Sequence, residues 1–154
     1  MKDIRILTIG KPKTSFHREA AEHYLQRLSH FGRVEVTHIK DADPKLPPPQ
    51  RRVWEGARLL ERLPSGREII CLDETGKTLS SEAFAHLLQR LEDAARPPCF
   101  IVGGPYGLDD AVRAKADRVL SFSPMTMTHE AALVFLLEQL YRARNILAGT
   151  GYHH

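Results

Sequence analysis

The sequence is poor in cysteine and has no long apolar run. Its two cysteines, Cys71 and Cys99, lie inside apolar stretches and lack CxxC spacing. This pattern predicts reduced thiols buried in a core, which is typical of a cytoplasmic protein. No apolar stretch approaches the length of a membrane span, and the first residues carry no apolar signal core. We therefore expect a cytoplasmic protein with no membrane partner.

Motifs that bind metals or phosphates are also missing. The histidines other than His129 and His153 have no ligand spacing with a cysteine or an acid, so no metal is expected. The segment GGPYG follows an apolar run but lacks the lysine and Ser/Thr of a phosphate-binding P-loop. Its GGxxG spacing also differs from the dinucleotide fingerprint. These absences count against a triphosphate or a dinucleotide as the ligand.

The composition is that of a globular protein with a mildly basic surface. The chain has 154 residues, of which 42% are hydrophobic and 27% charged, which predicts one domain over residues 1–154. Its net charge is +3, and 15 of its 22 basic residues are arginine, whose planar guanidinium group suits phosphate. A polyanionic partner such as RNA fits this balance, and a surface that only aids solubility is the alternative.

Apolar patterns predict alternating strands and helices. Strands are expected at 4–10, 33–39, 67–73, 99–103 and 118–123, and helices at 14–31, 51–63, 81–91, 109–115 and 130–148. The proline-rich stretch 40–52 is expected as an internal loop and 74–77 as a turn. The alternation predicts an α/β fold, a mostly parallel sheet with helices on both faces. The apolar face of helix 51–63 is formed by Val53, Trp54, Ala57, Leu60 and Leu63.

Three strand ends are the expected ligand site. Ligands of parallel sheets bind at the carboxyl ends of strands, which here are 72–73, 103–104 and 122–123. In SFSPMTMTH, Met125 and Met127 flank Thr126, so a flat apolar ring could lie against them. Core packing is the alternative for these methionines. Glycine, small hydroxyl residues and apolar walls favour a neutral adenosine moiety over a triphosphate.

Several motifs resemble one known family. The segments GGPYGL, LSFSPMTMTH, EQLYRA and the terminal YH resemble the ribosomal RNA large subunit methyltransferase H family, which consists of small SPOUT-class enzymes. The likeness extends to ILTIGK and CLDETGK and covers nearly the whole chain in order. It implies S-adenosylmethionine-dependent methylation of N3 of a pseudouridine in 23S rRNA on assembled ribosomes. It also implies a homodimer, no metal and a C-terminal trefoil knot.

The resemblance further implies which residues bind the cofactor. By motif, these are Leu72, Gly103, Phe122, Ser123, Pro124, Met125, Thr126 and Met127, with Gly104 as a neighbour. The chain departs from the family at Thr128, where a proline is usual, at Glu130, and at Leu133, where an arginine is usual. These departures concern local RNA contacts more than cofactor binding, so a shifted substrate preference is possible.

Four residues are candidates for the chemistry. The proton on N3 must leave, which calls for a base. His153 is a candidate base, with Tyr152 on the target ring; a frayed terminus is the alternative. His129 has either a site role or a local role at the helix entry. Arg142 could clamp a phosphate or the base, or it could only pair with Glu138 four residues earlier.

The predicted helix at 130–148 indicates how subunits could assemble. Its segment AALVFLLEQLY is apolar on almost every face, which predicts burial and, in a chain of this size, a subunit interface. Two other functions are compatible with the residues. One is a non-catalytic RNA- or ribosome-binding protein of the same fold, and the other is a flavodoxin-like binder of another nucleotide.

Overall fold

Five strands form one parallel sheet in the computed structural model, which describes residues 3–153. Their order across the sheet is β2-β1-β4-β3-β5. The strands are β1 (Asp3–Ile9), β2 (Arg33–Ile39), β3 (Glu68–Thr78), β4 (Pro98–Val102) and β5 (Arg118–Ser121). The helices are α1 (Ser15–Leu28), α2 (Pro48–Arg62), α3 (Ser81–Asp93), α4 (Asp110–Lys115) and α5 (His129–Ala148).

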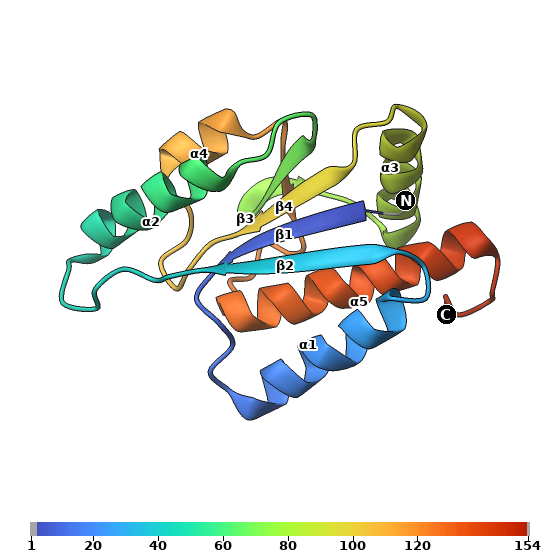
Figure 1. Cartoon of the computed structure of the whole chain (residues 1–154), viewed down its shortest axis with the longest axis horizontal. Helices are drawn as coiled ribbons and strands as arrows, with labels where there is room; N and C mark the ends of the chain where they lie inside the picture. The colour runs from blue at the N-terminus through green and yellow to red at the C-terminus, as the bar shows by residue number, and fades with distance from the viewer. Residues whose placement is uncertain (1–2, 154) are drawn as a thin grey trace.

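Helices cover both faces of the sheet, which confirms the predicted α/β class (Figure 1). Helices α2 and α4 lie on one face and α1, α3 and α5 on the other. Successive residues of β4 therefore enter different cores. Phe100 joins the core under α3 and α5, whereas Cys99 and Ile101 join the core under α2 and α4. A strand buried on both faces has to be apolar at every position, as the segment CFIV is.

Both cysteines are free and buried, as predicted. Burial raises the pKa of the Cys71 thiol to about 12 and that of the Cys99 thiol to about 11, because a thiolate would lose its hydration there. The two side chains pack in the core under α2 and α4 as small apolar groups.

Helix α2 differs from the sequence-based prediction in its start and in its buried face. It begins at Pro48, inside the expected loop, because the first helical positions need no N–H donor. Its buried residues are Glu55, Gly56 and Leu59. Of the predicted apolar face, Leu60 and Leu63 pack against the core, whereas Val53 (58% exposed) and Ala57 are exposed, so the prediction was wrong for these two residues. A Cβ on Gly56 would lie 2.9 Å from the Asp109 Cβ, so this face packs closely on the chain before α4.

Strand β3 is longer than predicted and contains a bulge. It pairs with β5 at 70–72 and again at 77–78, so the expected turn at 74–77 is part of an interrupted strand. The second pairing with β5 requires glycine at position 76, because a Cβ added there would lie 2.7 Å from the Leu120 carbonyl carbon. Residues 73–76 therefore leave the ladder at the carboxyl end of the sheet.

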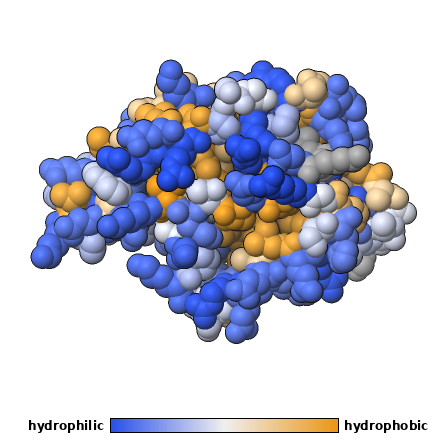
Figure 2. Space-filling view, in the orientation of Figure 1, coloured by the Kyte–Doolittle hydropathy of each residue, from blue (hydrophilic) through white to orange (hydrophobic). Residues whose placement is uncertain are grey.

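Helix α5 runs between α1 and α3 and begins beside the carboxyl edge of the sheet. Its start is capped by Thr128, whose Oγ1 accepts a hydrogen bond from the Ala131 N–H at 3.1 Å. Most of its apolar side chains are buried or half-buried, but Phe135 remains 37% exposed. Figure 2 shows a mostly hydrophilic face on which hydrophobic residues reach the surface between β2 and α1.

None of the helices formed by residues 3–153 has the length and apolar character of a membrane span.

Candidate cofactor site

A cavity of about 650 Å³ opens at the carboxyl ends of β3, β4 and β5. Its position agrees with the site expected from the three strand ends. Eight of the nine residues assigned to the cofactor by resemblance line it: Leu72, Gly103, Gly104, Phe122, Ser123, Met125, Thr126 and Met127. Pro124 is exposed and is not among the lining residues.

The glycine loop forms the part of the wall that follows β4. The Gly107 N–H donates to the Gly104 carbonyl at 3.0 Å, closing a tight turn. A Cβ on Gly103 would lie 2.9 Å from the Gly107 carbonyl carbon, and one on Gly104 would lie 2.9 Å from Glu55 Oε1. These two glycines are thus required by contacts within the protein, in addition to any close approach of a ligand.

The loop 121–128 forms the opposite wall and is held by its own hydroxyl groups. Ser121 Oγ accepts from the Ser123 N–H at 3.1 Å, and Ser123 Oγ accepts from the Met125 N–H at 3.0 Å. Thr126 Oγ1 donates to Glu74 Oε2 at 2.5 Å, which joins this loop to the β3 bulge. Met125 is 80% exposed, so core packing does not explain this residue.

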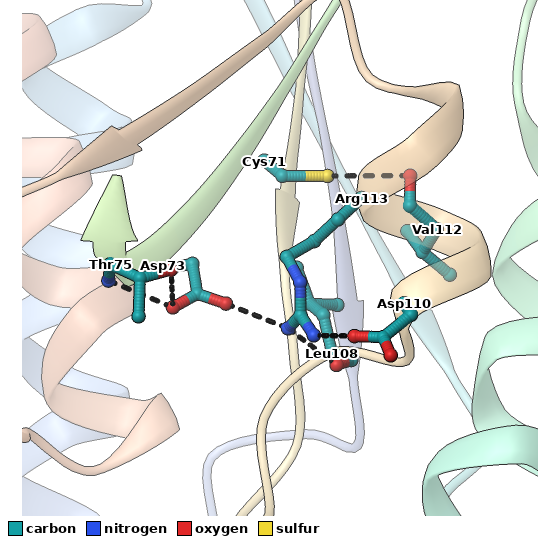
Figure 3. A network of polar contacts seen from close by, with 7 residues as sticks. All are labelled: Cys71, Asp73, Thr75, Leu108, Asp110, Val112 and Arg113. Atoms are coloured by element: carbon teal, nitrogen blue, oxygen red, sulfur yellow. Dashed lines mark hydrogen bonds and ion pairs between the residues drawn. The ribbon is translucent and has the colours of Figure 1, made fainter. Parts of the chain in front are cut away.

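Arg113 is the centre of an ion-pair network that forms part of the cavity lining; Figure 3 shows its contacts. Arg113 donates to Asp73 Oδ2 at 2.8 Å and to the Leu108 carbonyl at 2.7 Å, and it also bonds Asp110. Burial raises the pKa of Asp73, but hydrogen bonds from Thr75 and the charge of Arg113 outweigh it and hold this pKa below its usual value. The network joins the end of β3, the glycine loop and α4.

Sequence reasoning missed Arg113. Its partner Asp73 is 40 residues away in the sequence, so spacing gave no indication of the pair. The detectable features were Asp73 at a strand end and Asp110 three residues before Arg113.

The charge of the lining favours a cationic ligand. Four carboxylates and two guanidinium groups line the cavity: Asp73, Glu74, Asp109, Asp110, Arg52 and Arg113. This excess of acid attracts a positively charged group and disfavours a ligand that places several phosphates inside the cavity. Among residues 3–153, no three His, Cys, Asp or Glu side chains are grouped to hold a metal ion.

His129 lines the cavity at the first turn of α5. Burial lowers its pKa, although the carboxylates of Glu130 and Glu55 oppose the shift. The imidazole is therefore mostly neutral near pH 7 and can accept a proton. The next residue, Glu130, accepts hydrogen bonds from the Lys13 N–H and from Thr14, so the start of α5 is tied to the loop before α1.

The other three candidate catalytic residues lie together but away from the cavity. The guanidinium carbon of Arg142 is 5.3 Å from the centre of the Tyr152 ring, and Arg142 Nη1 is 3.4 Å from His153 Nδ1. Arg142 also pairs with Glu138 at 2.9 Å, which confirms the predicted helical ion pair. His153 Nε2 lies 2.8 Å from Glu82 Oε1 on α3. We call Arg142, Tyr152 and His153 the tail cluster.

The tail cluster is remote from His129 within one chain. Arg142 follows His129 by thirteen residues on α5, and a rise of 1.5 Å per residue separates their Cα atoms by about 20 Å. None of the three residues of the cluster lines the cavity. Tyr152 and His153, the candidates for the ring contact and for the base, therefore do not reach the cavity of their own chain.

Comparison with known proteins identifies the family. A family model described as "Predicted SPOUT methyltransferase" matches residues 1–153. The "Ribosomal RNA large subunit methyltransferase H" of Nitratidesulfovibrio vulgaris strain Miyazaki F is 52% identical over 155 residues, covering 100% of both chains. The protein of the same name from Oleidesulfovibrio alaskensis is 48% identical, again with 100% of both chains covered.

A solved structure supports the fold. The crystal structure of a probable methyltransferase from Bordetella pertussis Tohama I superimposes with a TM-score of 0.56 at 16% identity, covering 93% of this chain and 95% of that one. At this identity the likeness concerns the fold alone. With the full-length matches to named relatives, the conclusion is that the chain belongs to the ribosomal RNA large subunit methyltransferase H family of SPOUT methyltransferases.

Proposed function

We propose that the protein transfers a methyl group from S-adenosylmethionine to N3 of a pseudouridine in 23S rRNA of the assembled large ribosomal subunit. The observation that carries this proposal is an acid-rich cavity formed by the family's motif residues, in a chain 41–52% identical to relatives named for rRNA methylation. A single SPOUT domain over residues 1–154, acting in the cytoplasm, is part of the proposal.

The residues of the cavity fit S-adenosylmethionine. A volume of about 650 Å³ lies within the range of small-molecule sites. Met127 and Leu72 would provide apolar walls for the adenine ring, and the excess of carboxylates would suit the positive charges of the sulfonium and ammonium groups. FMN and ATP, which carry phosphates, suit this lining poorly. When bound, S-adenosylmethionine supplies an electrophilic methyl group.

The chain then has to position the target base and remove a proton from its N3. His129 supports this role because it lies in the cavity and its lowered pKa keeps it neutral. His153 is the second candidate base, with Tyr152 available to stack on the target ring and Arg142 to hold a phosphate or a ring oxygen. Much of the rate enhancement in such a displacement comes from positioning.

A homodimer in which the tail cluster of one protomer reaches the cavity of its partner would unite the two groups of residues. Their separation of about 20 Å along α5 supports this arrangement. The exposed side chains of Phe135 and Met125 provide apolar surface close to the cavity. The trefoil knot that the resemblance implies belongs to the same proposal.

Ligand binding and product analysis test the proposed function. Calorimetry should detect binding of S-adenosylhomocysteine and none of FMN or ATP. Mass spectrometry of nucleosides from 23S rRNA should show a methylated pseudouridine in the parent strain, its loss in a deletion strain and its return with the restored gene. An unchanged nucleoside profile after deletion, with S-adenosylhomocysteine binding retained, would favour a different substrate. An unchanged profile without S-adenosylhomocysteine binding would favour the non-catalytic binding protein.

A mixed dimer tests the composite site. Thr126→Trp fills the cavity, and Arg142→Ala removes the centre of the tail cluster; each homodimer should be inactive. Unfolding and refolding the two together at equal amounts should restore about a quarter of the wild-type rate, because half of the dimers then carry one intact composite site out of two. If each site were built from a single chain, the mixture would stay inactive.

A further inference from the structure

Tyr106 stands on the rim of the cavity in a rigid turn. The turn runs from Gly104 to Gly107, with Pro105 before Tyr106, and the Gly107 N–H donates to the Gly104 carbonyl at 3.0 Å. Proline and glycine occupy the positions that a type I turn prefers. The Tyr106 side chain lines the cavity yet is 45% exposed. Its ring is therefore held in place while part of it faces solvent.

Arg51 lies over the Tyr106 ring. Its guanidinium carbon is 5.0 Å from the centre of the ring, a distance typical of a cation–π contact. Arg51 Nε is buried and has no hydrogen-bond partner among residues 3–153, and no ion pair orients the group there. The ring contact is the interaction that places this guanidinium. The adjacent residue on α2, Arg52, lines the cavity itself.

A second pair of the same chemistry shows what is particular to Tyr106 and Arg51. Arg58 lies over the Trp54 ring on the same helix, with its guanidinium carbon 5.1 Å from the ring centre. Arg58 also pairs with Glu61 at 3.4 Å, and neither Arg58 nor Trp54 lines the cavity. The Trp54 pair thus lies away from the cavity, whereas the other pair has Tyr106 in the cavity lining with Arg51 over its ring.

We propose that Tyr106 and Arg51 form a stacking platform for an unpaired nucleobase of the RNA substrate, a proposal that rests on the proposed function. Unpaired RNA bases stack on exposed aromatic rings and on guanidinium planes. The guanidinium covers one part of the ring, and a base stacks on the part that remains open. Arg52 contacts the adjoining phosphate, which sets the path of the strand into the cavity. Tyr106 and Arg51 are positioning residues for the target nucleotide.

Steady-state kinetics with ribosomal subunits as substrate test the platform. Tyr106→Ala and Arg51→Gln should each raise the KM for ribosomal subunits, for Tyr106→Ala about tenfold, as expected for the loss of one base–aromatic stack. Affinity for S-adenosylhomocysteine should not change. Tyr106→Phe should restore the wild-type KM because it keeps the ring, and Arg58→Gln should match the wild type. The double variant should be less impaired than independent effects predict, because the two groups act as one unit.

Two results would overturn the platform. One is an unchanged KM in Tyr106→Ala, and the other is a loss of S-adenosylhomocysteine affinity with the KM unchanged, which would place the ring on the cofactor. Equal melting temperatures establish that each variant is folded. If the wild type binds S-adenosylhomocysteine but transfers no methyl group, the proposed function fails by itself. Cosedimentation with ribosomes then tests the platform separately. If the platform exists, Tyr106→Ala must bind ribosomes more weakly than the wild type does.

Discussion

Replacing Glu130 with glutamine tests how the start of α5 is fixed beside the cavity. The Glu130 carboxylate accepts hydrogen bonds from the Thr14 hydroxyl at 2.6 Å, from the Thr14 N–H at 3.3 Å and from the Lys13 N–H. It therefore joins α5 to the loop before α1, next to His129. Glutamine keeps the length and one carbonyl oxygen but removes the charge and one acceptor.

The magnitude follows from the pKa of Glu130. The Thr14 hydroxyl bond, joined by the N–H bonds of Lys13 and Thr14, outweighs the effect of burial and lowers this pKa from 4.5 to about 2. At 1.36 kcal/mol per pKa unit, the ionised carboxylate stabilises the fold by about 3 kcal/mol. Its side chain is 12% exposed, so solvent screening is modest. Because glutamine retains one acceptor, we expect a loss of about 2 kcal/mol, or roughly 4–8 °C in Tm for a chain of this length.

Urea unfolding at several pH values measures the effect. The folded-state pKa of Glu130 lies below its unfolded value, so its contribution is complete above pH 4.5 and disappears as the pH falls towards about 2. The difference between wild type and Glu130→Gln should therefore be largest at pH 7 and shrink through this window. The exposed Glu19 provides the control variant Glu19→Gln. A Glu130→Gln protein within about 0.5 kcal/mol of the wild type at pH 7, the usual range for surface substitutions, would refute the reasoning.

Three further substitutions or reactions have defined outcomes. Arg113→Ala should weaken S-adenosylhomocysteine binding measured by calorimetry, because Asp73 and the β3 bulge lose their anchor; an unchanged affinity would show that the network serves stability alone. Cys71 and Cys99 should not react with a thiol-specific disulfide reagent at pH 8 until urea unfolds the protein, since burial shields both sulfurs and raises their pKa values to about 12 and about 11; rapid reaction of the native protein would contradict their burial. Arg142→Lys should slow methyl transfer and leave cofactor binding intact, because a lysine cannot replace a planar bidentate donor; full activity would count against that role.

The alternation of strands and helices could be predicted because each element carries its own periodicity. The buried face of α2 could not, because it depends on contacts with distant residues. The Glu55 carboxylate accepts a hydrogen bond from the Ala42 N–H at 3.0 Å, and Gly56 admits the Asp109 side chain. A charged residue and a glycine thus occupy the interior face, while Val53 is exposed. Periodicity of apolar residues gives no indication of such an exchange.

For the candidate site too, some features could be predicted from the sequence and others could not. Strand ends and motifs predicted the lining by Gly103, Ser123 and Met127, because parallel strands bring their carboxyl ends to one edge. The β3 bulge was missed because the return to the ladder at Lys77 depends on pairing with β5, more than 40 residues later. Arg113 was missed for the same physical reason: its partner Asp73 becomes a neighbour only when the sheet is assembled.

The geometry of α5 limits how the candidate catalytic residues can act. His129 lies at the cavity and Arg142 lies about 20 Å further along one rigid helix, whereas an arginine side chain extends only about a third of that distance at ~1.5 Å per bond. Local rearrangement of the tail can move Tyr152 and His153, but it cannot move Arg142 relative to His129 while α5 stays intact. We therefore expect the two residues to act on one nucleotide as members of different protomers. An Arg142 that proves essential for methyl transfer in a protein whose mixed dimers show no complementation would contradict this arrangement.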